Sequence, residues 1–154
     1  MPQAQGWIDE HPDLIAKAAA AVTIEHFGCE EWVDDLVNGY HYTGENEATG
    51  LWASQTPMTT IAIDTVQAND LGHTSVLRGP VQFGVGAAFE SSAGIPQMGF
   101  IAGPNYLVAI DDNGQMDKYD SGLARKQLRW TADVLHRLDQ FDSQTLRTGL
   151  LFMS

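Results

Sequence analysis

Apolar residues recur at intervals of three or four in several stretches of the chain, which predicts amphipathic helices. One helix is expected to open at Pro12, another at Thr56–Pro57 with threonine as cap, and a short one to cover 87–93. The last and longest is expected over 121–139, capped by Asp120 or Ser121. Its predicted buried stripe has steps of four and three and consists of Ala124, Leu128, Thr131, Leu135 and Leu138.

Runs of β-branched or apolar residues that end at glycine or another turn residue predict strands between these helices. The predicted strands cover 22–27, 51–54, 74–77 and 97–102. The run at 22–27 and the run at 97–102 are expected to be buried in one sheet. Residues 34–50 are rich in Gly and Asn and predict a loop with a short hairpin around Tyr40 and Tyr42.

The alternation of helices and strands predicts an α/β fold. We expect a single domain over 1–154, built as a three-layer sandwich with a mostly parallel sheet and helices on both faces. In such sheets, ligands bind beyond the carboxyl ends of the strands. The ends of the predicted strands are therefore where candidate chemistry is sought.

The net charge of the chain limits the kinds of partner that it can bind. The chain has 154 residues and a formal net charge of -12, which argues against binding nucleic acid or anionic membrane. Residues 1–77 hold 12 acidic residues and one basic residue, Lys17. This acidity is either a solvated surface or a face for a cation or a cationic partner.

The sequence shows no targeting signal and no cysteine pair that would indicate a compartment. No run approaches the ~20 apolar residues of a membrane span, and the polar, acidic start does not resemble a signal peptide. A soluble protein of unknown compartment is expected. Cys29 is the single cysteine, so no internal disulfide forms.

Glu25 and His26 lie near the end of a predicted strand, just before the turn at Gly28, and we expect Glu25 to lie near the loop 79–90 and the segment 104–106. A carboxylate at this position can bind a metal, but it can equally cap a neighbouring helix or pair with a base such as Arg78, while His26 packs inside. Glu30 and Glu31 can supply a general base and a ligand, or form plain surface. Cys29 as a nucleophile would need a base beside it.

Several segments together resemble the co-catalytic zinc aminopeptidases, the family that includes secreted bacterial aminopeptidases, glutamate carboxypeptidase and glutaminyl cyclase. Thr23 to Gly28 resembles the strand that ends in a metal-binding acid, and Phe89 to Pro96 resembles the segment that closes on Gly-Ile-Pro. Pro104-Asn105-Tyr106 and Asp117 to Asp120 follow in the order of that family. The similarity covers roughly residues 10–140.

This resemblance implies the C-terminal half of a peptidase-like domain, with zinc as cofactor and Glu25 as a metal ligand. It implies a pocket for a peptide or small-molecule substrate. The pocket residues are His26, Phe89, Ile95, Pro96 and Tyr106. The earlier half of the family, which carries its His-x-Asp and Glu-Glu ligand pairs, has no counterpart here, and the histidine expected shortly after the Pro-x-Tyr segment is missing.

Two functions are therefore expected as alternatives. The first is a zinc aminopeptidase-like hydrolase domain that is truncated or catalytically incomplete. The second is a non-catalytic module on the same fold that binds peptides or a protein partner. An exposed sheet edge would also favour self-association.

Overall fold

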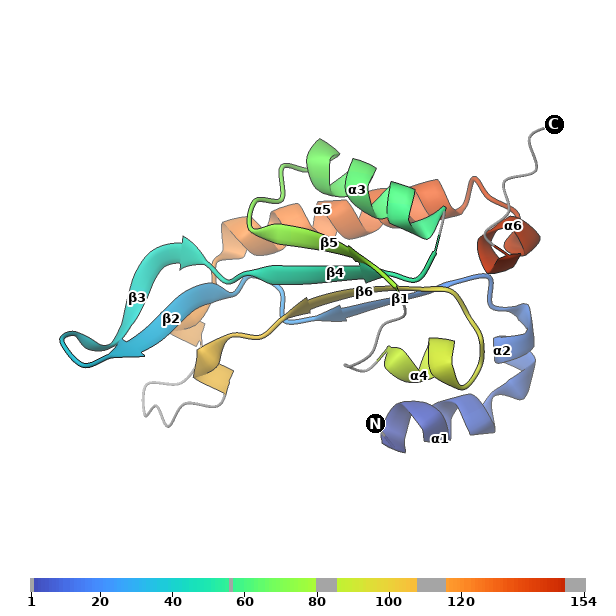
Figure 1. Ribbon diagram of the computed structural model, residues 1–154, viewed down its shortest axis with the longest axis horizontal. Helices are drawn as coiled ribbons and strands as arrows, with labels where there is room; N and C mark the ends of the chain where they lie inside the picture. The colour runs from blue at the N-terminus through green and yellow to red at the C-terminus, as the bar shows by residue number, and fades with distance from the viewer. Residues whose placement is uncertain (1, 56, 80–85, 108–115, 149–154) are drawn as a thin grey trace.

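The computed structural model describes residues 2–55, 57–79, 86–107 and 116–148 (Figure 1). The α-helices are α1 (Pro2–Glu10), α2 (Pro12–Lys17), α3 (Met58–Ala68), α4 (Ala87–Ser91), α5 (Ser121–Leu138) and α6 (Ser143–Thr148). The strands are β1 (Ala21–Glu25), β2 (Glu30–Asp35), β3 (Gly39–Asn46), β4 (Thr49–Ala53), β5 (Thr74–Arg78) and β6 (Gln97–Ala102). Two short 3-10 turns, η1 (Asn105–Leu107) and η2 (Met116–Lys118), complete the described elements.

The main sheet has the strand order β1-β6-β4-β5 and is mixed. The pairs β1/β6 and β4/β5 are parallel, whereas β4 and β6 in the middle are antiparallel. The two predicted runs at 22–27 and 97–102 do lie side by side in one sheet, as expected. The expectation of a mostly parallel sheet needs correction, because its two parallel pairs run in opposite directions.

Strand direction decides where a site can form. The carboxyl ends of β1 and β6 lie beside the amino ends of β4 and β5, since Thr49 is paired with both Ala102 and Thr74. The strand ends are therefore divided between two opposite edges. No single edge gathers the carboxyl ends of all four strands, which was the basis for expecting one ligand site.

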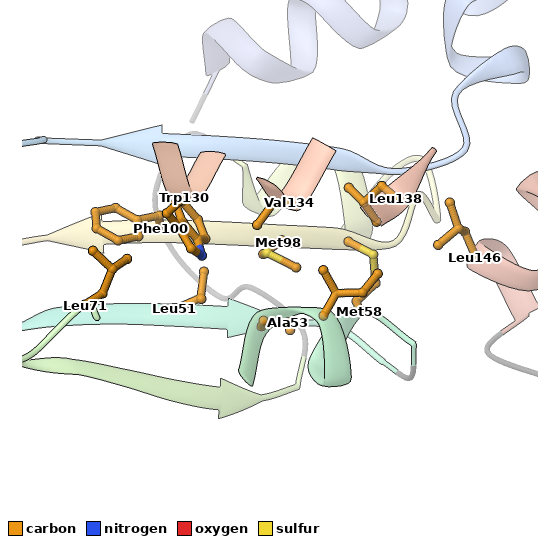
Figure 2. Packing of buried hydrophobic residues seen from close by; sticks show 12 residues of the cluster. Leu51, Ala53, Met58, Leu71, Met98, Phe100, Trp130, Val134, Leu138 and Leu146 are labelled. Atoms are coloured by element: carbon orange, nitrogen blue, oxygen red, sulfur yellow. The ribbon is translucent and has the colours of Figure 1, made fainter. Parts of the chain in front are cut away.

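Helices cover both faces of the sheet: α3 and α5 lie on one side and α1 and α4 on the other (Figure 1). The core between the sheet and the pair α3 and α5 is centred on Phe100 of β6 and Trp130 of α5, whose ring centroids are 4.9 Å apart (Figure 2). Trp130 Nε1 donates a hydrogen bond of 3.0 Å to the Thr65 hydroxyl of α3. This bond satisfies a polar group that would otherwise be costly to bury.

Two expectations about burial are wrong. β1 is an edge strand that ends at Glu25, and Ile24 is 37% exposed, so the run at 22–27 is not a buried strand. In α5 the buried residues are Ala124, Gln127, Trp130, Val134 and Leu138. Leu128 and Leu135 of the predicted stripe are instead 57% and 53% exposed.

Residues 30–46 are more regular than the predicted loop. β2 and β3 form a two-stranded antiparallel sheet, in which Trp32 packs against Tyr40 and Tyr42. Cross-strand aromatic pairs of this kind stabilise a ribbon. At the turn, the Asp35 carboxylate accepts hydrogen bonds from Asn38 and Val37, which lower its pKa to about 2.

Candidate functional site

Glu25 and His26 lie at the carboxyl end of β1, beside the carboxyl end of β6. Glu25 is half-buried and is the register partner of Ile101. His26 has a positive φ of 63°, which turns the chain out of the strand. Its Nδ1–H donates to the Ala102 carbonyl at 2.8 Å, because a carbonyl can only accept. The Nε2 atom is thus the lone-pair nitrogen of the neutral ring.

The alternative partner proposed for Glu25, Arg78, lies elsewhere. Arg78 ends β5, the opposite edge strand, where it is paired with Ala53. Ala53 in turn is paired with Met98, whose partner on β1 is Val22 rather than Glu25. Register therefore separates the two side chains by the width of the sheet, and they do not form the structural ion pair that the sequence allowed.

Tyr106 lies at the same edge as Glu25 and His26, in the turn η1 that follows β6. It is buried together with Cys29 and Ala102 against Trp32 and Tyr40 of the hairpin. The Tyr106 and Cys29 side chains are hydrogen-bonded, and burial raises the pKa of the Cys29 thiol. A thiol held protonated is a weak nucleophile, and among the described residues Cys29 Sγ donates to the His26 carbonyl, so Cys29 is a packing residue of this small core.

Two further charged groups surround this small core. The Lys118 side chain is 1% exposed, and its Nζ atom lies 4.8 Å above the Trp32 ring and 3.1 Å from Asp117 Oδ1. Burial raises the pKa of the Glu47 carboxyl, and the nearby Glu31 raises it further. Glu47 Oε2 is buried without a hydrogen-bond partner among the described residues. These groups were not expected from the sequence, where no spacing links residues 29, 47, 106 and 118.

The other predicted pocket residues lie at the opposite end of β6. The backbone N–H of Ile95 donates to the Phe89 carbonyl, and the Pro96 carbonyl accepts from Ala21 at the start of β1. Phe89 packs against Trp7 of α1, while Ile95 and Pro96 are buried. At ~3.3 Å per residue, β6 separates this group from Tyr106 by about 16 Å. The predicted pocket is therefore split in two.

A zinc site would need several ligands around Glu25. Among the described residues, no group of three or more His, Cys, Asp or Glu side chains is placed to share a metal ion. Glu25 was also expected to lie near the loop 79–90, of which residues 80–85 lie outside the described part. Gly79 lies beside Ala53, at the far end of the sheet. The described residues therefore do not complete a zinc site, and we derive no step that involves this metal.

An open polar cleft of about 550 Å³ lies between the hairpin and the start of α5. Its charged groups are already paired: His73 Nε2 is 3.8 Å from Glu45, and Lys126 Nζ is 3.2 Å from Asp70. Asp120 caps α5 by accepting from Gly122 and Leu123. The three carboxylates of this cleft outnumber its one lysine, but each of them already has a partner within the chain.

A different surface combines apolar character with exposure. Val22 and Ile24 lie on β1, and Leu128, Thr131 and Leu135 lie on the side of α5 on which Leu135 shares a groove with Val22. These five residues are here called the β1–α5 face. Ile24, Leu128 and Leu135 are exposed, and none of them belongs to the core cluster. An open groove of about 390 Å³ extends this face toward α6. Its lining is Ala19, Ala20, Val22, Leu135, Leu138, Asp139, Phe141 and Leu146.

The signal for this face was present in the sequence. The stripe of Leu128, Thr131 and Leu135 was recognised as apolar and assigned to the core. What the sequence could not give is the rotation of α5 about its axis, which turns Trp130 and Val134 inward and leaves this stripe at the side. An apolar stripe left at an open edge marks an interaction site or an aggregation liability.

No family model matches the chain, and no curated protein or solved structure is similar enough to it to count as a match. In the described ranges, no helix is both long enough and apolar enough to cross a membrane. The geometry of the chain itself is therefore the basis for proposing a function.

Proposed function

We propose that the chain is a non-catalytic protein-interaction module that binds a partner segment along the β1–α5 face. The observation that carries this proposal is the exposure of Leu128 and Leu135 beside an edge strand. An open strand offers backbone hydrogen bonds to an added strand, and the neighbouring apolar stripe offers side-chain contacts.

The backbone of β1 supports strand addition. Ala21 N–H donates to the Pro96 carbonyl next to β6, and backbone groups of successive residues in a strand point to opposite sides. The N–H and C=O groups of Val22 and Ile24 therefore point to the open edge. Within the described ranges, no hydrogen bond from another segment reaches them.

Selection of extended peptides tests this function. Peptides selected on the immobilised chain should carry apolar residues at alternate positions, because one face of an added strand would pack on Leu128 and Leu135. Leu135→Asp should abolish their binding. The matched control is Leu36→Asp, since Leu36 is fully exposed at the hairpin turn and far from this face. Equal binding to both variants would refute the proposal.

A hydrolase with an aminopeptidase-like fold remains the second candidate, and the position of Glu25 is what supports it. The carboxylate ends β1 beside His26, as the resemblance implies for a metal ligand. This candidate requires ligands and a catalytic base beyond the residues described, and turnover by the pure chain would favour it over the interaction module.

A further inference from the structure

The two parts of the β1–α5 face share a common level along the sheet. Ile24 is the register partner of Phe100, whose ring centroid lies 4.9 Å from that of Trp130. Thr23 is the neighbour of Ile24 on β1, and Thr131 is the neighbour of Trp130 on α5. The centre of the edge strand and the centre of the exposed stripe, between Leu128 and Leu135, are therefore at the same height.

The two flanks of α5 are occupied differently. On one flank, Asp133 accepts from Asn69 of α3, and Lys126 and Arg137 form ion pairs with Asp70 and Asp64. On the other flank, Leu135 lines the open groove with Val22. α3 contacts mainly β4 and β5, so α5 lies above β6 and β1, at the open side of the sheet.

We propose that a second copy of this chain covers the β1–α5 face, related to the first by a two-fold axis that passes beside Thr23 and Thr131. This inference rests on the proposed function, since it names the partner of the same face. Two-fold pairing is the commonest form of self-association, and it places identical faces against each other.

A single two-fold axis allows β1 to pair with its copy and α5 to pack against its copy. Antiparallel pairing of β1 with its copy about Thr23 sets Val22 opposite Ile24, whose outward backbone groups then bond each other. Strands are ~4.8 Å apart, so helices above the β1/β6 pairs of both copies would be about 10 Å apart. That is close to the normal packing distance between helices. Leu128 of each copy then faces Leu135 of the other.

Charge favours the same arrangement. On α5, Lys126 and Arg137 are paired on the flank toward α3, whereas Arg125 and Arg129 are exposed, in a chain of net charge -12. Two such chains repel each other least where this helix faces the partner. The antiparallel helix pairing also brings Arg125 of one copy beside Asp139 at the end of α5 in the other.

Sedimentation velocity of the full chain in the micromolar to millimolar range tests the proposal. We expect a monomer–dimer equilibrium. Leu128→Glu or Leu135→Glu should weaken dimerisation about tenfold or more. Leu36→Glu should leave it unchanged. Because Leu128 and Leu135 are already exposed, circular dichroism should show all three variants folded as the parent.

Exchanging the charges of Arg125 and Asp139 tests whether the two α5 helices pair antiparallel. Arg125→Glu and Asp139→Arg should each weaken the dimer several-fold, and the double variant should restore it. The two residues are about 21 Å apart along one helix, so rescue reports a contact between copies. A parent that stays monomeric, a dimer insensitive to Leu135→Glu, or a double variant without rescue would overturn the inference. A monomer that still binds selected peptides through Leu135 would refute the dimer alone and leave the proposed function standing.

Discussion

The backbone N–H of Gly28 donates a buried hydrogen bond of 2.7 Å to Oε1 of Gln127. Gly28 has a positive φ of 71°, and an added Cβ would lie 2.6 Å from the Tyr119 ring, so glycine is required at this turn. The bond fixes Gln127 on the inner side of α5. Trp130 and Val134, three and seven residues further on, consequently face the core, and Leu128 and Leu135 are turned to the side.

Neighbouring residues of α5 should thus respond oppositely to truncation. Val134→Ala should lower the free energy of unfolding by about 2 kcal/mol, because it removes buried methyl groups and leaves a cavity. Leu135→Ala should change it by less than about 0.5 kcal/mol. Urea unfolding of both variants at a dilute, monomeric concentration measures the difference. A larger loss for Leu135→Ala would show that the helix is rotated as the sequence first indicated.

The elements themselves could be predicted from local patterns, because capping residues, glycines and β-branched runs act within a few residues. Asp120 caps α5 and the strands at 74–77 and 97–102 are found almost at their predicted bounds. The rotation of α5 was not predictable in this way. It depends on Gln127, a polar residue that is buried only because Gly28, 99 positions earlier in the chain, supplies its partner.

The separation of the predicted pocket residues has a related cause. Its residues were grouped by the family resemblance, whereas the way the strands of this chain pair, such as the antiparallel contact of β4 and β6, is a long-range property that no local pattern shows. Tyr106 follows the carboxyl end of β6 and Phe89 precedes its amino end. The strand therefore keeps them apart, although the sequence places both near the same motif.

The close packing around Gly86 gives a second test of stability. A Cβ on Gly86 would lie 1.5 Å from Gln97 Nε2 and 2.4 Å from the Thr23 hydroxyl, which are hydrogen-bonded to each other at 2.8 Å. Gly86→Ala should break this partly buried bond and cost about 1–3 kcal/mol of unfolding free energy. Gly103→Ala is the control, since nothing lies within 4 Å of a Cβ there. Equal melting temperatures for the two variants would contradict the packing.

Glu47 should make stability depend on pH. Burial, and then Glu31, raise its pKa in the folded state above the ordinary value of 4.5. The folded chain thus binds this proton more tightly than the unfolded chain, so the contribution is fully present below pH 4.5 and is lost as pH rises through the folded-state pKa. Glu47→Gln removes the charge and should stabilise the protein at pH 7 by up to about 1 kcal/mol.

The gain from Glu47→Gln should shrink as the pH falls through the folded-state pKa, and it should be smallest below pH 4.5, where the parent carboxyl is protonated in both states. Chemical unfolding of parent and variant at several pH values measures this convergence. Glu45→Gln serves as the control, because Glu45 is exposed on the same hairpin. A constant difference at all pH values would show that the gain does not come from the ionisation of Glu47.

Peptidase activity should be absent from the pure chain. The part of the zinc aminopeptidases that carries their His-x-Asp and Glu-Glu ligand pairs, before the strand that resembles 23–28, has no counterpart in this sequence, and no histidine closely follows Tyr106. We therefore expect no hydrolysis of aminoacyl arylamides with zinc added, because one carboxylate cannot form a dinuclear site. Turnover that a chelator abolishes would contradict this expectation and revive the hydrolase candidate.

Glu25 itself can be tested apart from activity. If Glu25 is a residue of a binding site, Glu25→Gln should change stability by less than about 1 kcal/mol, since half-buried positions at a strand end tolerate an isosteric amide. A lone carboxylate holds zinc weakly, so zinc should raise the melting temperature of the parent slightly, and the variant should lose that rise. Asp34→Gln controls for zinc on the acidic surface, because Asp34 is exposed on the hairpin. A large loss of stability with no change in the response to zinc would instead show that Glu25 holds β1 in place as a structural acid.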